Sequence, residues 1–148
     1  MMNRSQRLAI VEKLIRKQEE QLARALTLAR ENVQKEQAKL QELIGYQSSY
    51  EDEFRAQGKK GISGQQWQSY QHFISQLDNV IKVQNHTILM AQRQVVEVMQ
   101  RWKQIHLKRK SMSSFIESVR FEEWVAQEKL EQKHNDELVT QMFSRIKS

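Results

Sequence analysis

Apolar residues recur at alternating spacings of three and four along the second half of the chain. This series contains Trp67, Tyr70, Ile74, Leu77, Ile81, Gln84, Ile88, Ala91, Val95, Val98, Trp102, Ile105, Arg109, Met112, Ile116 and Val119. Fourteen of these sixteen positions are apolar, and only Gln84 and Arg109 interrupt them. A heptad repeat keeps one stripe of a helix facing a partner helix, so the pattern predicts a coiled-coil seam. We place this helix at about residues 64–142.

The first half carries the same rhythm with a shift in register. One register runs through Leu8, Val11, Ile15, Gln18 and Leu22. The next runs through Leu22, Leu26, Ala29, Val33, Glu36, Leu40, Leu43, Gln47, Tyr50 and Phe54. Consecutive spacings of four around Leu22 form a stutter, which locally unwinds a supercoil. We predict a first helix over about residues 4–57.

Signals that end one helix and start the next coincide between the two patterns. Gly58 is suited to end the first helix in the left-handed conformation that glycine tolerates. Ser63 followed by Gln66 forms a capping box for the second helix. We therefore predict a turn at residues 58–63 and an antiparallel pair of helices on either side of it.

The turn also sets the alignment of the two helices. We place Phe54 opposite Trp67, beside the turn. The same alignment puts Leu8 near Ser113 and leaves residues past about Val119 without a partner in the chain. The predicted fold is all-α, a single antiparallel coiled-coil hairpin domain (residues 1–148) whose longer second helix overhangs at the C-terminus.

Composition narrows the alternatives to this fold. The chain has 148 residues, no proline and no cysteine, and its four glycines lie between Gly45 and Gly64. Folds that need many turns are excluded, and so is a disulfide framework. No apolar run approaches the ~18 residues that span a bilayer, and no apolar segment of a secretory signal follows the N-terminus. We expect a soluble intracellular protein.

Residues that could support catalysis do not cluster along the chain. The four histidines, His72, His86, His106 and His134, are widely separated, and no phosphate-binding glycine loop or metal-ligand spacing occurs. A two-helix hairpin also offers little concavity for an active site. We expect no enzymatic activity, no metal and no cofactor.

Positive charge concentrates at the end of the hairpin that holds the N-terminus. The net charge is +6, and nearly all of it falls within residues 101–120. The predicted basic patch consists of Arg4, Arg7, Arg101, Lys103, Lys108, Arg109 and Lys110. It is either a solvated face or a contact for an acidic protein surface or nucleic acid. Nucleic acid is the weaker functional option, because few aromatic residues lie among these charges.

Two further sets of apolar residues exceed what a two-helix seam requires. A stripe near the turn, the tip stripe, contains Leu43, Tyr46, Tyr50, Phe73 and Leu77, with Val80 beside it. The predicted C-terminal overhang, the tail, carries Phe121, Trp124 and Leu130. The tip stripe either shields the seam or docks another protein. The tail has no apolar neighbour within the predicted hairpin.

Two segments near the turn resemble a known family. Residues 43–50 (LIGYQSSY) and 61–74 (GISGQQWQSYQHFI) are similar to the flagellar export family FliJ, most clearly across about Leu40 to Ile81. Stalk proteins of virulence type III secretion systems share the helical pattern. The tyrosines and the G-I-S…W-x-x-Y segment favour the flagellar branch. A generic coiled-coil scaffold that dimerises through its tail is the remaining alternative.

The resemblance implies a non-enzymatic stalk or adaptor of the flagellar type III export apparatus. It implies a monomer in the cytoplasm, held at the inner face of the membrane by partners: the ATPase hexamer FliI, the export gate FlhA and chaperones such as FlgN and FliT. The gate-contact positions of the family fall here on the tip stripe. The family pattern departs at Lys39, Val80 and Gln84. We assign the basic patch to the ATPase ring and the tail to chaperones.

Overall fold

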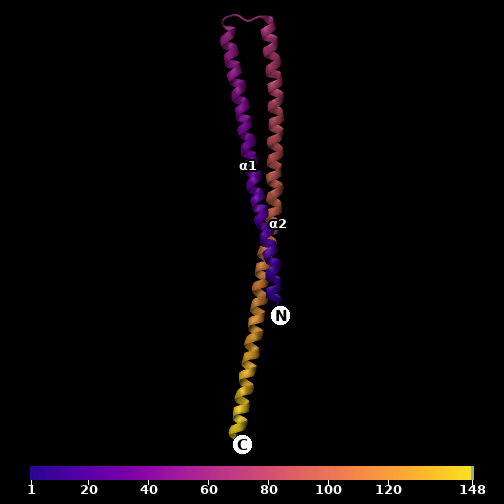
Figure 1. Cartoon of the computed structure of the whole chain (residues 1–148), viewed down its shortest axis with the longest axis vertical. Helices are drawn as coiled ribbons and strands as arrows, with labels where there is room; N and C mark the ends of the chain where they lie inside the picture. Colours follow the sequence, from indigo (N-terminus) through magenta and orange to yellow (C-terminus); the bar gives the residue numbers. More distant parts are fainter. Residues whose placement is uncertain (148) are drawn as a thin grey trace. The chain divides into compact units, whose positions relative to one another are not determined.

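A computed structural model describes residues 1–147, which form two α-helices and no strand (Figure 1). Helix α1 spans Arg4–Gly58 and helix α2 spans Gly64–Lys147. The two helices run antiparallel from a short turn, which confirms the all-α hairpin. The end of α2 lies beyond the predicted residue 142. No helix among the described residues is long and apolar enough to cross a membrane.

The chain groups into two compact units, each built from a segment of α1 and a segment of α2. The tip unit, Gln21–Trp102, contains the turn. The terminal unit combines Met1–Glu20 with Lys103–Ser148. On α1 the division falls beside Leu22, where the heptad pattern has its stutter. That the whole chain forms a single domain stays a prediction.

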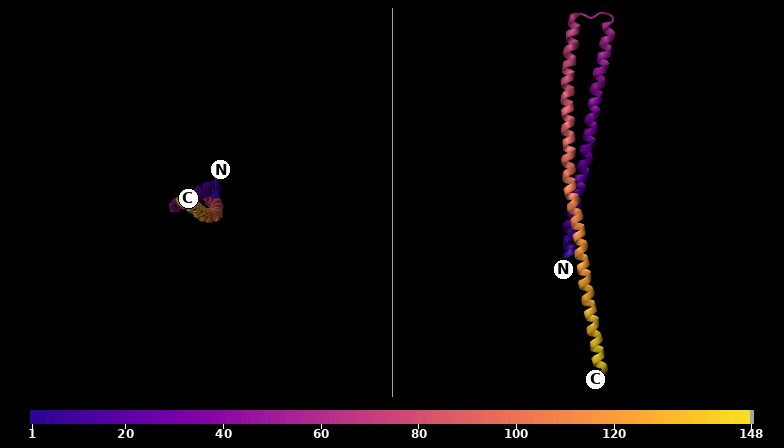
Figure 2. Two further views of the ribbon diagram at one scale, coloured as in Figure 1. Left: turned by 90° about the horizontal axis from the view of Figure 1, so that it is seen from below. Right: turned by 180° about the vertical axis from the view of Figure 1, so that it is seen from behind.

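The core of the tip unit lies on the predicted seam. Its buried apolar residues are Leu26, Leu77, Ile88, Ala91 and Val98. Contacts such as the Tyr50–Phe73 ring pair (4.3 Å) and the Gln84–Glu36 hydrogen bond (2.7 Å) place the α1 and α2 segments of this unit side by side (Figures 1 and 2). Heptad spacing therefore identified the side chains that the two helices bury against each other.

The terminal unit has a smaller apolar core. Ile15 of α1 and Ile116 and Val119 of α2 are buried, and Ile116 is only 1% exposed. All three are predicted seam positions. Ser5 is the one buried polar residue among the described residues, at 4% exposed. The seam of this unit thus relies on polar contacts as well as on apolar burial.

The turn contains the predicted capping box, but its left-handed glycine is not the predicted one. Ser63 N donates to Gln66 Oε1 at 3.0 Å and Gln66 N donates to Ser63 Oγ at 3.1 Å, which completes the capping box. Gly58, however, is the last residue of α1, and the left-handed residue is Gly61, with φ of 95°. The hydrogen bond from Gly61 N to Gly58 O (3.2 Å) continues the helical path before the chain reverses.

The N-terminus of α1 has a second capping box that the sequence interpretation missed. Asn3 N donates to Gln6 Oε1 at 3.0 Å, and Gln6 N donates to Asn3 Oδ1 at 2.9 Å. Asparagine followed three residues later by glutamine is the signal that predicts it. Because α1 has no acidic residue in its first turn, Glu123 of α2 supplies the carboxylate that accepts from Ser5 N at 3.0 Å.

The bond between Ser5 and Glu123 also corrects the predicted start of the tail. Residues past about Val119 were expected to lack a partner, but α1 reaches Glu123. Ser113 Oγ donates to Glu12 Oε1 at 3.1 Å. The predicted alignment put Leu8, not Glu12, near Ser113. The two agree because side chains on a helix lean toward its N-terminus, so the Glu12 carboxylate lies about one turn back, at the level of Leu8. Pairing with α1 therefore extends to at least Glu123, so Phe121 of the tail lies within the paired stretch of α2.

Candidate protein-interaction surfaces

Aromatic rings from both helices form a continuous ladder beside the turn. Phe54 stacks on Tyr70 at a centroid distance of 3.7 Å and also contacts Trp67 at 5.7 Å. Tyr50 lies 4.3 Å from Phe73. The rings of this ladder come alternately from α1 and α2, so they hold the two helices together. Burial within the ladder raises the pKa of the Tyr70 hydroxyl.

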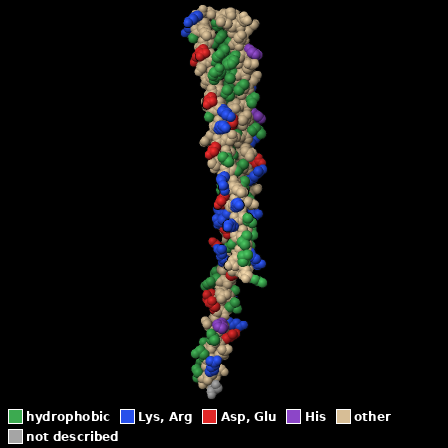
Figure 3. Space-filling model, viewed as in Figure 1, with side chains coloured by type: hydrophobic (Ala, Val, Ile, Leu, Met, Phe, Trp, Pro, Cys, Tyr) green, Lys and Arg blue, Asp and Glu red, His purple; other side chains and the backbone are tan. Residues whose placement is uncertain are grey.

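The tip stripe divides into side chains that belong to the core and side chains that face solvent. Leu77 is 8% exposed and packs in the seam, while Leu43, Tyr50 and Phe73 are half-buried. Tyr46 is 58% exposed, and its ring meets Phe73 edge-on at 6.2 Å. Hydrophobic side chains gather over this end of the tip unit, near the turn (Figure 3). Tyr46, with exposed Val80, is therefore available to a partner, and Leu77 is not.

Most residues of the predicted basic patch lie in the terminal unit. Arg4, Arg7, Lys103, Lys108 and Lys110 are exposed there. The guanidinium of Arg4 lies 5.3 Å from the centre of the Phe115 ring, a cation–π contact. Arg101 belongs to the tip unit, where it pairs with Glu97 at 2.8 Å. The structure thus gathers six of the seven predicted residues in one unit.

Arg109, the remaining member of the basic patch, is committed to an ion pair. Its Nε donates to Glu19 Oε2 at 3.0 Å, and His106 Nδ1 lies 2.9 Å from the same oxygen. The Arg109 and Glu19 side chains are only 19% and 18% exposed. Arg109 therefore links α2 to α1 and is not presented to solvent like its lysine neighbours.

The other polar interruption of the α2 seam is paired as well. Gln84 Nε2 donates to Glu36 Oε2 at 2.7 Å and to the Glu36 backbone oxygen at 2.8 Å. Gln47 Nε2 donates to Asp78 Oδ1 at 2.7 Å. The sequence analysis noted Gln84, Glu36 and Gln47 as breaks in the heptads without pairing them. These polar seam residues lie on both helices at matching levels of the predicted alignment, and this could have predicted their pairing.

The carboxylates that join the helices of the terminal unit are stabilised in their ionised form. A hydrogen bond from Arg16, and a second from Ser113, lower the pKa of Glu12. Burial opposes ionisation of Glu19, but bonds from Arg109 and His106 outweigh it and lower its pKa. The hydroxyl and backbone N–H of Ser5 lower the pKa of Glu123. In the tip unit a bond from Gln84 likewise lowers the pKa of Glu36.

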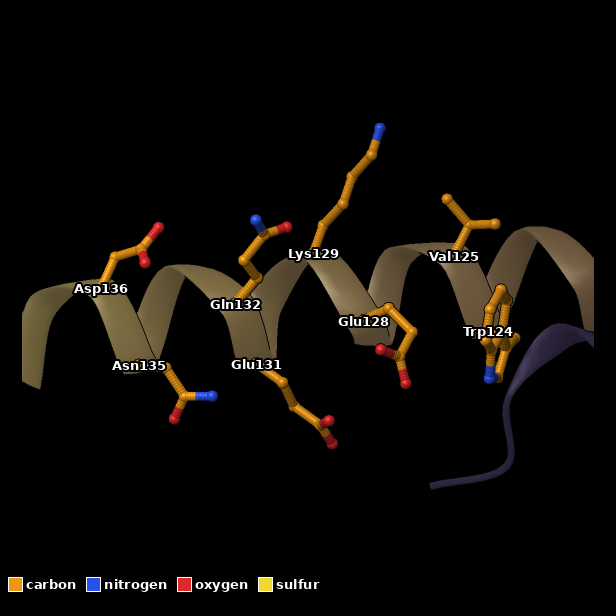
Figure 4. A pocket seen from close by; sticks show the side chains of 8 residues that line it. All are labelled: Trp124, Val125, Glu128, Lys129, Glu131, Gln132, Asn135 and Asp136. Atoms are coloured by element: carbon orange, nitrogen blue, oxygen red, sulfur yellow. The ribbon is translucent and has the colours of Figure 1, made fainter.

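The tail presents apolar residues to solvent. Phe121, Trp124 and Leu130 are each at least 60% exposed, and the first two rings stack at 6.1 Å. A shallow hollow here is lined by Trp124, Val125, Glu128, Lys129, Glu131, Gln132, Asn135 and Asp136 (Figure 4). All eight side chains come from α2 and project to both sides of it. The hollow is an open helix surface, suited to protein contact rather than to enclosing a small substrate.

Comparisons with known proteins agree with the resemblance seen near the turn. The family model described as "Flagellar FliJ protein" matches residues 4–148. The chain is 25% identical to a protein of Escherichia coli (strain K12) named "Flagellar FliJ protein", over 138 residues that cover 93% of this chain and 94% of that protein. No solved structure gave a significant match.

Proposed function

The chain belongs to the flagellar FliJ family, and from that premise we propose that it is a stalk or adaptor of flagellar protein export without catalytic activity of its own. It links the export ATPase ring, FliI, to the export gate, FlhA, and it handles chaperones such as FlgN and FliT. It works as a monomer in the cytoplasm, held by these partners at the inner face of the membrane. The observation that carries the proposal is a family match that extends over both units, from residue 4 to residue 148.

Gate binding is assigned to the tip stripe of the tip unit. Tyr46 is exposed at the end of the ring ladder, so a partner can bury it without opening the seam. The Tyr46 ring contacts Phe73, and Phe73 in turn contacts Tyr50, while Leu77 belongs to the core. Large aromatic side chains that are exposed beside a rigid support are the residues that dominate many protein interfaces.

The test of this assignment is the affinity of the full chain for the soluble domain of FlhA. We expect Tyr46→Ala to weaken binding by at least about tenfold, which corresponds to the ~1.4 kcal/mol of a modest interface hot spot. Ile44→Ala is the matched control, because Ile44 is also exposed on α1 but lies on a different face. If both variants bind FlhA as tightly as the wild type does, the assignment of gate binding to the tip stripe is wrong.

Contact with the ATPase ring is assigned to the exposed cations of the terminal unit. Arg7, Lys103 and Lys108 make no ion pair within 4.0 Å among the described residues, and they face solvent. An acidic surface on the ring would attract such a patch, and salt would weaken the contact. Arg109 is excluded from this role because it already binds Glu19.

The corresponding variant carries Arg7→Glu, Lys103→Glu and Lys108→Glu, and its readout is stimulation of ATP hydrolysis by FliI. The matched control places the same charge change in the tip unit with Lys59→Glu, Lys60→Glu and Lys82→Glu, all exposed positions. We expect the first variant to lose stimulation and the control to retain it. The assignment is wrong if both behave alike.

Chaperone capture is assigned to the tail. Truncation after Ala126 leaves Glu123 to bind Ser5 and removes Leu130, so the terminal unit keeps its pairing while the part of the tail beyond residue 126 is lost. We expect weaker binding of FlgN or FliT and unchanged helix pairing. A second variant, Trp124→Ala, removes an exposed ring without shortening the chain. Full chaperone binding by both variants would refute this role of the tail.

A further inference from the structure

The apolar seam of α2 could in principle pair with a second copy of itself. Fourteen of its sixteen positions are apolar, from Trp67 to Val119. In a parallel, in-register pair of α2 helices each seam residue would face its own copy, so every apolar position would match. Heptad apolarity alone therefore does not explain why α2 pairs with α1 of the same chain.

The two polar positions of this seam respond differently to such self-pairing. Two Gln84 side chains facing each other can exchange hydrogen bonds, because each amide both donates and accepts. Two Arg109 side chains only donate, and their like charges repel within a partly desolvated seam. None of the sixteen seam positions of α2 is acidic, so a facing copy offers no carboxylate at this level.

Helix α1 supplies the acceptor that a second α2 lacks. Glu19 accepts from Arg109 Nε at 3.0 Å, and His106 Nδ1 lies 2.9 Å from the same carboxylate oxygen. Arg109 is more than four-fifths shielded from solvent in the hairpin, so a second α2 that covered it in the same way would leave its charge without a carboxylate and without water. Arg109 is thus satisfied in the hairpin and repelled in the parallel dimer.

We propose that the Glu19–Arg109 pair determines partner choice: it directs α2 to its own α1 and prevents parallel self-association through the α2 seam. Its role is specificity rather than added stability. Ion pairs in such positions contribute little more than well-packed apolar residues, but they discriminate between registers and partners. The inference does not depend on which export protein binds the chain.

The test compares the mass of full-length variants by light scattering over a range of concentrations. Glu19→Leu with Arg109→Leu should keep its helix content and become a dimer or larger, while the wild type stays monomeric. The matched control is Glu36→Leu with Gln84→Leu, which also replaces a carboxylate and its seam donor by leucines. It should stay monomeric, because Arg109 still opposes self-pairing.

A charge swap, Glu19→Arg with Arg109→Glu, keeps the argument testable if the leucine variant fails to fold. It restores opposite charges between α1 and α2 and like charges between two copies of α2, so we expect a helical monomer. The proposal is overturned if the wild type is itself a dimer, if the leucine variant of the pair folds as a monomer, or if the swap associates. Association of the Glu36–Gln84 control would equally overturn it, since polarity rather than charge would then be decisive.

Discussion

The tip unit and the terminal unit use the same heptad seam but are held closed by different interactions. In the tip unit, five buried apolar residues and a ladder of stacked rings join α1 to α2. In the terminal unit, three buried apolar residues are supplemented by the carboxylates of Glu12, Glu19 and Glu123, which accept hydrogen bonds across the helix pair. The same repeat is thus supplemented mainly by aromatic rings in the tip unit, which also holds the Gln84–Glu36 and Gln47–Asp78 hydrogen bonds, and mainly by carboxylates in the terminal unit.

This difference indicates how each unit should respond to change. Apolar burial and ring stacking do not depend on the ionisation of side chains, whereas carboxylate contacts do. The tip unit therefore offers a firm base for an exposed aromatic side chain. The terminal unit combines a smaller apolar core with a basic surface, so the pairing of its two helix segments should be lost first as the pH falls.

The largest expected effect comes from a charge in the core of the tip unit. Ile88→Asp buries a carboxylate among apolar seam residues and should destabilise the unit by about 4 kcal/mol or more. Leu89→Asp is the neighbouring control at an exposed position and should lose about 1 kcal/mol. Thermal melts followed by circular dichroism measure both. Similar melting temperatures for the two variants would mean that the seam is misassigned.

The ring ladder should be the next most sensitive feature. Phe54→Ala removes contacts with both Trp67 and Tyr70 and should destabilise the tip unit by about 2–3 kcal/mol. Tyr46→Ala loses one edge contact from an exposed ring and should lose less than about 1 kcal/mol. Chemical denaturation of the full chain compares them. A larger loss for Tyr46→Ala would place that ring in the core rather than on a surface.

The two units should differ in acid stability, and the helix pairing of the terminal unit should weaken at a higher pH than that of the tip unit. The pKa values of Glu12, Glu19 and Glu123 are lowered in the folded chain. Their contribution to stability is therefore complete above the unfolded pKa and is lost as pH falls through the lower folded values. With unfolded glutamate near pKa ~4.3, we expect this loss between about pH 5 and pH 3. The tip unit, with Glu36 as its one glutamate of lowered pKa, should respond less.

Distances between nitroxide labels can measure this difference in acid stability. The chain has no cysteine, so a pair of introduced cysteines would be the only sites of labelling. Labels at Lys13 and Lys110 report on the terminal unit, and labels at Glu42 and Asn79 report on the tip unit; all four positions are exposed. The distance distribution of the first pair should broaden at a higher pH than that of the second. Simultaneous broadening, or earlier broadening in the tip unit, contradicts the ionic account of the terminal unit.

The smallest expected effects lie in the turn. Gly61→Ala forces a side chain into a left-handed residue and should destabilise the hairpin by about 1–2 kcal/mol. Gly58→Ala places a Cβ 3.4 Å from Ile62 Cδ1, an ordinary contact, within helical backbone. It should be neutral or stabilising by up to about 1 kcal/mol. Equal losses in thermal melts would show that the turn does not distinguish the two glycines.

Most of the fold follows from the sequence because its signals are local and repetitive. All eight buried apolar residues, among them Ile15, Leu26 and Ile116, occupy predicted seam positions. The Ser63–Gln66 capping box, which the structure contains, was recognisable from the spacing of these two residues in the sequence. Heptads, caps and turn residues depend on neighbours a few positions away, so one sequence is enough to interpret them.

What the sequence could not supply depends on contacts between distant residues. Leu77 belonged both to the predicted seam and to the predicted docking stripe, and only the packing shows that it is a seam residue. Arg109 looked like one more exposed cation until Glu19, on the other helix, was placed beside it. The paired stretch of α2 extends past the predicted limit at about Val119, because Ser5 reaches the carboxylate of Glu123. In each case a choice between surface and seam depended on the side-chain geometry of the partner helix.

The central claim is that the two differently built units carry separable functions, and a double comparison on the same preparations tests it most directly. One variant changes the tip (Tyr46→Ala with Val80→Ala) and the other changes the terminal cations (Arg7→Glu, Lys103→Glu and Lys108→Glu). Both are measured for binding to the soluble domain of FlhA and for stimulation of ATP hydrolysis by FliI. The account predicts that the tip variant loses only gate binding and the terminal variant loses only stimulation. Loss of both activities in either variant, with helix content unchanged, would contradict it.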